Sequence, residues 1–248
     1  MRVALVGAPG TDACTLGRLL ASRLGAQHVS VRRLIDLEVT HQTALGVELA
    51  SQLAARPGAL LPMRLVAPLL DQLWGGSRPP TSFVLSGYPR DAQQWRHLRR
   101  HTDVSQVIHL RSDADLLRTS APLRCSCPAC SARLYPDELV LRDGRVLPAV
   151  LECCGSAREP IPPRTDAAAI FEARLAAYEA TTRPWLDSQR ESGLVQEMFA
   201  DVRWPQLFPI LERLVGLAPN ASATASISDS GAGASLRSSA THSSDHPS

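Results

Sequence analysis

A glycine-rich segment near the start of the chain holds the first residues whose types and spacing indicate chemistry. Gly7-Ala8-Pro9-Gly10 follows an apolar run at residues 3–6 and precedes a stretch with helical periodicity. A strand, a glycine-rich turn and a helix in this order are typical of a phosphate-binding loop, which ends in Gly-Lys-Thr or Gly-Lys-Ser. This chain instead has Asp12-Ala13-Cys14-Thr15. All 26 basic residues are arginine, so the sequence offers no lysine to replace the missing one.

Asp12 is the residue of this loop that most affects phosphate binding. The backbone N–H groups of residues 10–15 could still surround an anion at the start of the helix. A carboxylate there would repel a phosphate about 4 Å away by roughly 4 kcal/mol at an effective dielectric near 20. Asp12 would then be either a helix cap that competes with nucleotide or a carboxylate that takes the place of a phosphate. The preference of Asp for N-cap positions favours the first interpretation.

Cysteines form the second group of candidate ligands, since five of the six fall between residues 125 and 154. Cys127-Pro128-Ala129-Cys130 is a CxxC knuckle typical of structural zinc, and Cys153-Cys154-Gly155 follows. A tetrahedral site needs a fourth ligand, for which Cys153, Cys125 and Glu152 are the candidates. The alternative is a degenerate knuckle with free thiols. We predict a structural Zn²⁺ bound by Cys127, Cys130, Cys153 and Cys154.

The elements that must position these residues alternate along the chain. Strand-like apolar runs cover residues 2–6, 27–30, 83–86, 106–110 and 194–199. Helical periodicity covers residues 15–24, 32–39, 44–54, 63–74, 91–100, 113–119, 166–182 and 204–215. This alternation predicts an α/β fold with a five-stranded parallel sheet and helices on both faces. Residues 124–164 interrupt the alternation, and their Cys, Pro and Gly content predicts a small inserted β module.

Length, composition and charge restrict the class of protein. A chain of 248 residues fits one α/β domain with an appendage, and a net charge of +2 does not indicate nucleic-acid binding. The apolar runs are shorter than a membrane span and the N-terminus does not resemble a signal peptide, so we expect a cytoplasmic protein without membrane partners. Residues 217–248 are rich in Ser and Ala and are expected to be disordered.

Six segments follow one another in a fixed order. They are the Gly-Ala-Pro-Gly loop, His28-Val29-Ser30, Gly58-Ala59-Leu60-Leu61-Pro62, Ser86-Gly87-Tyr88-Pro89-Arg90 with Gln94, the cysteine-rich insert, and Arg174-Leu175-Ala176-Ala177-Tyr178 with Thr182-Arg183-Pro184. Together they resemble adenylate kinases, across residues 1–216. The subtype resembled carries a zinc ribbon in a lid that closes over ATP and AMP. The resemblance implies a P-loop nucleoside monophosphate kinase fold. It also implies a core at residues 1–123 and 165–216, monophosphate-site helices within residues 31–75, and a lid at residues 124–164.

The resemblance also suggests roles for single positions. Gly87, Arg90 and Gln94 match residues that hold AMP, and Thr15 matches the hydroxyl on the Mg²⁺ side. Arg124 and Arg174 match arginines that bind the transferring phosphoryl group, and Arg164 is a third candidate. Mg²⁺ is expected with nucleotide only if the protein is active. The expected catalytic residues are Arg124, Arg164 and Arg174, and the expected nucleotide-binding residues are Gly7, Gly10, Asp12, Ala13, Cys14, Thr15, Gly87, Arg90 and Gln94.

Several positions depart from the family pattern. Ala13 replaces the P-loop lysine, Val31 and Asp36 replace the AMP-site threonine and arginine, and Ser86 replaces an aspartate associated with Mg²⁺. Loss of one preorganised donor typically slows a reaction by a factor of about 100 to 1000. We therefore predict little or no phosphotransfer and a nucleotide-binding or scaffolding role with an unidentified protein partner. The alternative is an active nucleoside monophosphate kinase in which arginines replace the lysine, with Arg32, Arg33 and Arg164 as candidates.

Overall fold

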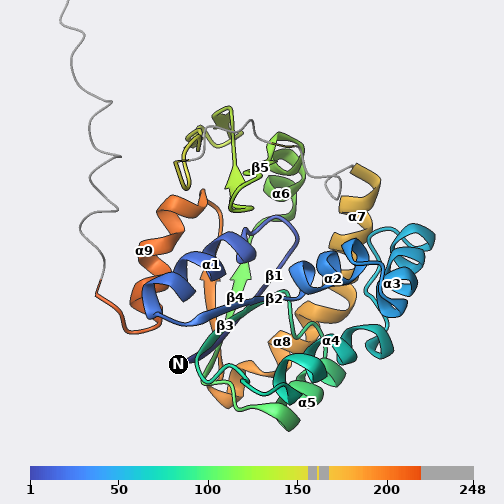
Figure 1. Cartoon of the computed structure of the whole chain (residues 1–248). Helices are drawn as coiled ribbons and strands as arrows, with labels where there is room; N and C mark the ends of the chain where they lie inside the picture. Colours follow the sequence, from blue (N-terminus) through green and yellow to red (C-terminus); the bar gives the residue numbers. More distant parts are fainter. Residues whose placement is uncertain (156–160, 162–167, 219–248) are drawn as a thin grey trace, which may run out of the picture.

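A five-stranded parallel sheet lies at the centre of the protein (Figure 1). The computed structural model describes residues 1–155, 161 and 168–218. All neighbouring strands of this sheet run parallel, and all five strands expected from the sequence are confirmed. Their spatial order is β2 (Gln27–Ser30), β3 (Phe83–Ser86), β1 (Arg2–Gly7), β4 (Gln106–Arg111) and β9 (Val195–Phe199).

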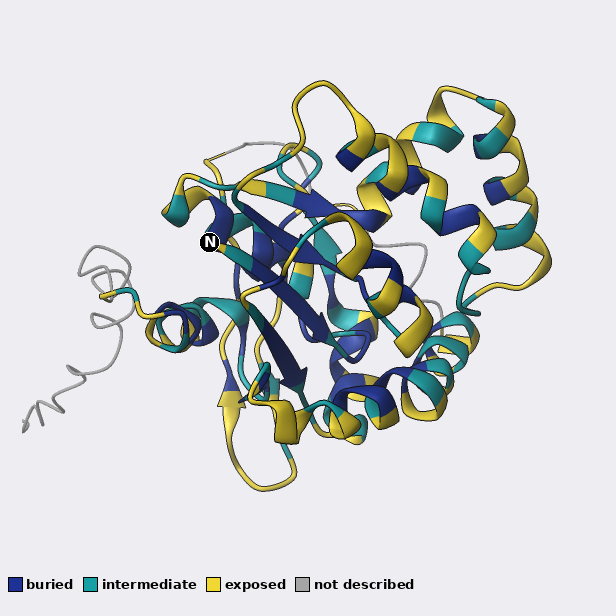
Figure 2. Cartoon of the chain, turned by 90° about the horizontal axis from the view of Figure 1, so that it is seen from below, coloured by how far each residue is buried: buried dark blue, intermediate teal, exposed yellow. Residues whose placement is uncertain are grey.

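Alternating side chains of the strands build two apolar cores, one on each face of the sheet. In β1, Val3 and Leu5 join one core, whereas Ala4 and Val6 join the other. Figure 2 shows the three central strands β3, β1 and β4 as largely buried, which explains their mostly apolar sequences, whereas the edge strands β2 and β9 keep exposed polar positions. The first core includes α1 (Ala13–Leu24) and α9 (Trp204–Leu214). The second includes α2 (Val31–Thr40), α3 (Ala44–Ala55), α4 (Met63–Gly75), α5 (Ala92–His101) and α8 (Arg183–Ser188).

Side-chain caps explain why several helices begin where the sequence predicts. Ser30 accepts a hydrogen bond from the Arg33 N–H at the start of α2, and Thr43 and Asp91 do the same for α3 and α5. Asp113 caps α6 (Ala114–Ser120), which precedes the cysteine-rich insert. These caps fix the helix starts that follow the carboxyl ends of β2, β3 and β4.

The helical segment expected at residues 166–182 differs from the structure at its C-terminal end. Its described part, from residue 168, consists of α7 (Ala168–Ala177), a π-helical turn, η3 (Tyr178–Thr182), and then α8, which continues to Ser188. Pro184 follows the π-helical turn directly and lies in the first turn of α8, and the helical path continues through it. A short 3₁₀ turn, η4 (Arg190–Ser192), then leads to β9.

The cysteine-rich insert is a small β module in its described part. The 3₁₀ turn η1 (Ala121–Leu123) leads to β5 (Cys125–Ser126), which pairs antiparallel with β6 (Arg133–Leu134). A second antiparallel pair joins β7 (Leu139–Val140) and β8 (Val146–Leu147). Residues 156–160 and 162–167 lie outside the described residues, as do Arg164 and residues 219–248 of the expected tail. Among the described residues, no helix is long and apolar enough to cross a membrane.

Candidate functional site

The glycine-rich loop lies between β1 and α1, which confirms the expected strand, turn and helix. A Cβ atom on Gly7 would lie 2.7 Å from the Leu110 carbonyl oxygen of β4, so the chain can turn here only without a side chain. Gly10 has a φ of 110°, a conformation that glycine adopts without steric cost. The Thr11 hydroxyl donates to the Ala8 carbonyl at 2.8 Å and closes the turn. The loop therefore has the compact form that the sequence predicts.

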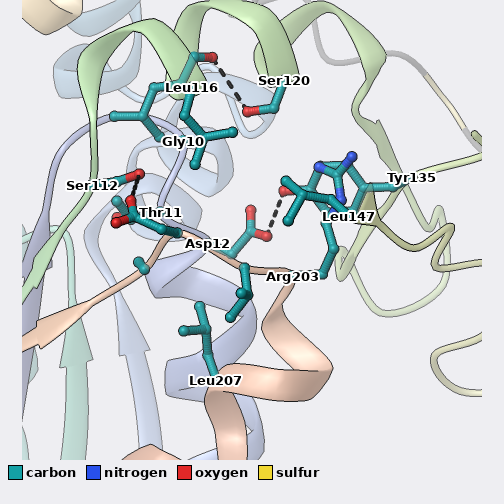
Figure 3. A pocket seen from close by; sticks show the side chains of 14 residues that line it. Gly10, Thr11, Asp12, Ser112, Leu116, Ser120, Tyr135, Leu147, Arg203 and Leu207 are labelled. Carbon is teal, nitrogen blue, oxygen red and sulfur yellow. Dashed lines mark hydrogen bonds between the residues drawn. The ribbon is translucent and has the colours of Figure 1, made fainter. Parts of the chain in front are cut away.

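Asp12 does not cap α1 with its side chain, so the favoured sequence interpretation is wrong. Its φ of 55° and ψ of 25° lie in the left-handed region, whereas a capping residue has an extended backbone. The side chain points to the insert, where the Tyr135 hydroxyl donates a 2.6 Å hydrogen bond to Asp12 Oδ2 (Figure 3). Arg124 Nη1 lies 3.9 Å from Asp12 Oδ1, which has no hydrogen-bond partner among the described residues.

Further contacts hold the insert against the loop. The Arg133 backbone N–H donates to Thr15 Oγ1 at 3.0 Å. A backbone group of the insert is therefore already hydrogen-bonded to the hydroxyl that the resemblance places beside Mg²⁺. Trp204 at the start of α9 donates from Nε1 to the Arg133 carbonyl at 2.8 Å. We refer to the bonds from Tyr135 to Asp12 and from Arg133 to Thr15 as the insert–loop contact. This contact brings together residues more than a hundred positions apart in the sequence.

Buried charges surround the insert–loop contact. Asp12 is 8% exposed, and Arg124 and Arg203 are each 3% exposed. The Arg203 guanidinium lies 3.6 Å from the centre of the Tyr135 ring, a cation–π geometry. Burial raises the pKa of Asp12, and the Arg124 charge and the Tyr135 hydrogen bond oppose that rise. Asp12 is thus an acidic group among arginines, at the position where the loop would bind an anionic ligand.

The residues expected to hold AMP lie together beyond the end of β3. Arg90 Nε donates to the Gly87 carbonyl at 3.0 Å, and the Arg90 backbone N–H donates to Gln94 Oε1 at 2.8 Å. Gly87 has a φ of 80°, which directs its carbonyl toward the arginine. Among the described residues no carboxylate pairs with Arg90, and burial lowers its pKa. The three residues form one preorganised group.

Two other positions that depart from the family pattern, Ser86 and Asp36, have partners within the protein. His28 Nε2 lies 2.9 Å from Ser86 Oγ, so the serine that replaces the family aspartate is hydrogen-bonded to a histidine. Burial, with contributions from Arg18 and Arg33, lowers the pKa of His28 to about 4. On the exposed face of α2, Arg32 forms an ion pair with Asp36 at 2.9 Å. That pairing turns Arg32 toward its own helix.

The remaining expected site residues lie at separate places. Cys14 is exposed, and its Sγ lies 3.6 Å from Ser30 Oγ. Arg174 is on α7, whose backbone lies against the loop before α4: a Cβ on Gly58 would lie 2.7 Å from the Ile170 carbonyl oxygen. Arg164 lies outside the described residues.

The four predicted zinc ligands converge at one end of the insert. Cys127 Sγ lies 3.7 Å from Cys154 Sγ, and Cys130 Sγ lies 3.5 Å from Cys153 Sγ. All four sulfur atoms lie within 4.8 Å of one another, and Cys125 is outside this group. Backbone hydrogen bonding near Cys130 lowers the pKa of Cys127 to about 6, whereas burial raises the pKa of Cys130 and of Cys153, so of these three thiols only Cys127 favours the thiolate form before a metal binds. Four sulfur donors at this spacing fit a structural Zn²⁺.

Sequence reasoning missed three residues that complete the site. Arg133 follows the first knuckle, and Arg203 and Trp204 lie at the start of α9. None of them belongs to a motif, and they reach the loop only because the insert and α9 fold toward it. Tyr135 was visible as an aromatic after the knuckle, but its bond to Asp12 was not.

The sheet order and the loop after β1 define the α/β fold of P-loop kinases. No family model matches the chain. The adenylate kinase of Mycobacterium ulcerans is 35% identical over 122 residues, which cover 47% of this chain and 66% of that protein. Those of Mycobacterium marinum and Mycobacterium tuberculosis are 34% identical with the same coverage. The chain belongs to the adenylate kinase family, and the matched part is just under two thirds of the length of these relatives.

Proposed function

We propose that this member of the adenylate kinase family is a nucleotide-binding or scaffolding module with little or no phosphotransfer. The observation that carries the proposal is the position of Asp12, a buried carboxyl group that accepts a hydrogen bond from Tyr135 within the phosphate-binding loop. Arg124 faces this carboxyl group at 3.9 Å. A triphosphate at the loop would have to displace these contacts.

The cost of that displacement supports weak ATP binding. A phosphate about 4 Å from an ionised Asp12 is disfavoured by roughly 4 kcal/mol at an effective dielectric near 20. Ala13 supplies no compensating cation, and Thr15 already accepts a hydrogen bond from Arg133. ATP would therefore compete with a folded part of the chain for the same groups.

The monophosphate side supports retained nucleotide binding. Arg90 is held by Gly87 and is not neutralised by a carboxylate among the described residues. A half-buried guanidinium that is oriented by the Gly87 carbonyl suits a phosphate monoester. Asp36 is paired with Arg32, so it does not face this group as a free charge. AMP-type nucleotides are therefore the proposed ligands, with ATP binding much more weakly.

The division of the chain follows from the same interpretation. We assign residues 1–123 and 165–216 to the core, with monophosphate-site helices within residues 31–75, and residues 124–164 to a lid. Zn²⁺ at the four cysteines would stabilise the fold of the lid and take no part in chemistry. Mg²⁺ would enter only with a nucleotide triphosphate.

One observation favours the alternative of an active kinase that uses arginines. Arg124 is buried and its guanidinium reaches the phosphate-binding loop, as a substitute for the lysine would have to do. Asp12 opposes this role, because a carboxyl group now lies beside that guanidinium. An active enzyme would have to separate the two before ATP binds.

Separate binding isotherms for AMP and for ATP with Mg²⁺ test the proposal. Wild-type protein should bind AMP, and Arg90→Ala should lose that binding. The double variant Asp12→Gly/Ala13→Lys removes the carboxyl group and adds the lysine, so its ATP affinity should rise by on the order of 100-fold or more. An equal ATP affinity of wild type and double variant would contradict the proposal.

A further inference from the structure

Two histidines and a carboxylate converge between α4 and α5, at the opposite end of the molecule from the insert (Figure 1). His97 and His101 lie one helical turn apart on α5, so both imidazoles project from one face of that helix. His97 Nε2 is 2.9 Å and His101 Nε2 is 2.8 Å from the same atom, Asp71 Oδ1. The three ligand atoms lie within 4.8 Å of one another.

The other nitrogen of His97 is fixed by a buried tyrosine. The Tyr88 hydroxyl donates to the Gln94 carbonyl at 2.9 Å and lies 3.1 Å from His97 Nδ1. The Tyr88 hydroxyl has one proton, which it donates to Gln94. His97 Nδ1 must therefore be protonated and donate to the Tyr88 oxygen. In the neutral ring, Nε2 then directs a lone pair at the Asp71 oxygen. A cation between the two atoms would satisfy both, and a hydrogen bond from the far nitrogen is the usual support of a metal-binding histidine.

The surroundings leave room for an ion and for solvent ligands. The side chains of Asp71, His97 and His101 are 50%, 10% and 25% exposed. They line a surface pocket together with Arg100, whose charge opposes a bound cation. The His101 ring also stacks on Trp74, with 6.1 Å between ring centres, which limits its rotation. The imidazoles are therefore held in place although the site is open.

We propose that Asp71, His97 and His101 form a metal site for a divalent transition ion such as Zn²⁺, separate from the four cysteines. Imidazole and carboxylate donors suit Zn²⁺, Co²⁺ and Ni²⁺, and three protein ligands leave a coordination position for water. The bound ion joins α4 to α5. Because the ion binds only the folded state, it stabilises that state by an amount that grows with the logarithm of the free metal concentration above the dissociation constant.

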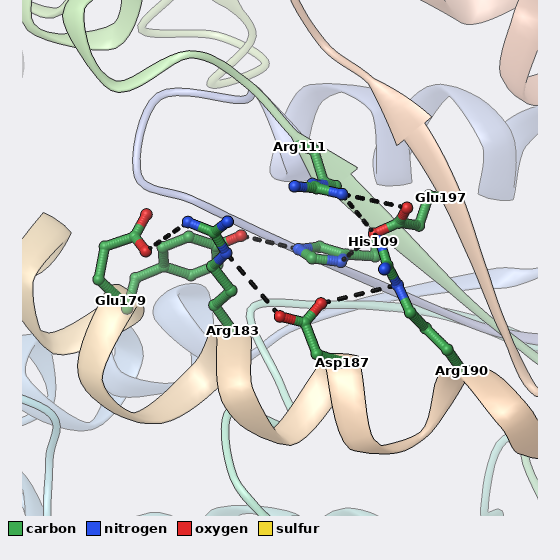
Figure 4. Close-up of polar contacts among 8 residues, drawn as sticks. His109, Arg111, Glu179, Arg183, Asp187, Arg190 and Glu197 are labelled. Atoms are coloured by element: carbon green, nitrogen blue, oxygen red, sulfur yellow. Dashed lines mark hydrogen bonds and ion pairs between the residues drawn. The ribbon is translucent and has the colours of Figure 1, made fainter.

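A second histidine cluster lacks these properties. His109, Asp187 and Glu197 also lie close together, but arginines already pair with both carboxylates (Figure 4). These partners are Arg111 and Arg190 for Glu197, and Arg183 and Arg190 for Asp187. The positive charges there would oppose an added cation. The cluster between α4 and α5 has no such ion pair from an arginine among the described residues.

Titration with Co²⁺ tests the proposed site without any activity assay. Cobalt bound by cysteine gives a thiolate charge-transfer absorption band, and cobalt bound by imidazole and carboxylate does not. Wild-type protein should bind one equivalent of Co²⁺ at the four cysteines and a second equivalent that adds no charge-transfer absorption. His101→Gln and Asp71→Asn should each weaken the second equivalent by at least about tenfold while the thiolate band is kept.

Control variants separate this site from general surface binding. His41→Gln removes an exposed histidine on another helix end and should leave both equivalents unchanged. Arg100→Gln removes the opposing charge and should increase the affinity for the second equivalent of Co²⁺. The proposal is overturned if wild type binds no second equivalent, which would mean that a proton alone joins His97 to Asp71. It is also overturned if His101→Gln and Asp71→Asn both bind as wild type does.

Discussion

The substitution Tyr135→Phe tests whether Asp12 holds the insert on the phosphate-binding loop. It removes the hydroxyl that donates at 2.6 Å to Asp12 Oδ2 and keeps the ring on which Arg203 stacks. A hydrogen bond to a charged acceptor contributes about 1.5 to 3 kcal/mol. If the insert separates from the loop as a unit, the separated state should become about 10- to 150-fold more populated, at 1.4 kcal/mol per factor of ten.

Hydrogen exchange at the Arg133 amide reports this separation, because that N–H donates to Thr15 across the contact. Exchange at Arg133 should accelerate by about 10- to 150-fold in Tyr135→Phe. Tyr178→Phe is the matched control, since it removes another buried hydroxyl, bonded to His109 at 2.7 Å and not to the insert. Unchanged exchange in Tyr135→Phe, or the same acceleration in both variants, would refute the reasoning.

Two further predictions concern pH and metal. Burial lowers the pKa of His109 from 6.5 to about 4, so protonation favours the unfolded chain and stability should fall between pH 6.5 and 4 (Figure 4). The loss approaches roughly 3 kcal/mol at about 1.4 kcal/mol per pKa unit, and urea unfolding should show a shallower pH dependence in His109→Gln. Cys153→Ser should release Zn²⁺ to a chelator faster than wild type, whereas Cys125→Ser, outside the sulfur cluster, should not. Equal release from the two cysteine variants would contradict the assignment of the fourth ligand.

The fold was predictable because local signals agree with tertiary packing. The apolar run 3–6 is buried on both sheet faces, and Ser30, Thr43 and Asp91 cap helices near the expected positions. The expected end of the helical segment at residue 182 was wrong, because the chain continues through a π-helical turn into α8.

The site was less predictable because its contacts connect distant segments. The sequence favours a helix cap at Asp12, but the left-handed backbone at this residue turns the carboxyl group to Tyr135, 123 positions away. No local pattern contains that pairing. For the cysteines, the CxxC knuckle already indicated a cluster, and the structure places Cys153, and not Cys125 or Glu152, beside the other three sulfur atoms.

The metal site between α4 and α5 illustrates an intermediate case. The spacing of His97 and His101 is visible in the sequence and places both on one helix face. Asp71 belongs to a different helix, and only the packing of α4 against α5 brings it to both nitrogens. Two histidines on one helix become a candidate metal site only when a third ligand from another element is known.

Phosphorus NMR of zinc-loaded protein incubated with ATP, AMP and Mg²⁺ tests the central claim most directly. The position of Asp12 and the absence of a lysine at residue 13 predict no ADP above the level of Arg90→Ala after long incubation. ADP that forms with wild type and disappears in Arg90→Ala would contradict the account, and would identify an adenylate kinase that works through its arginines.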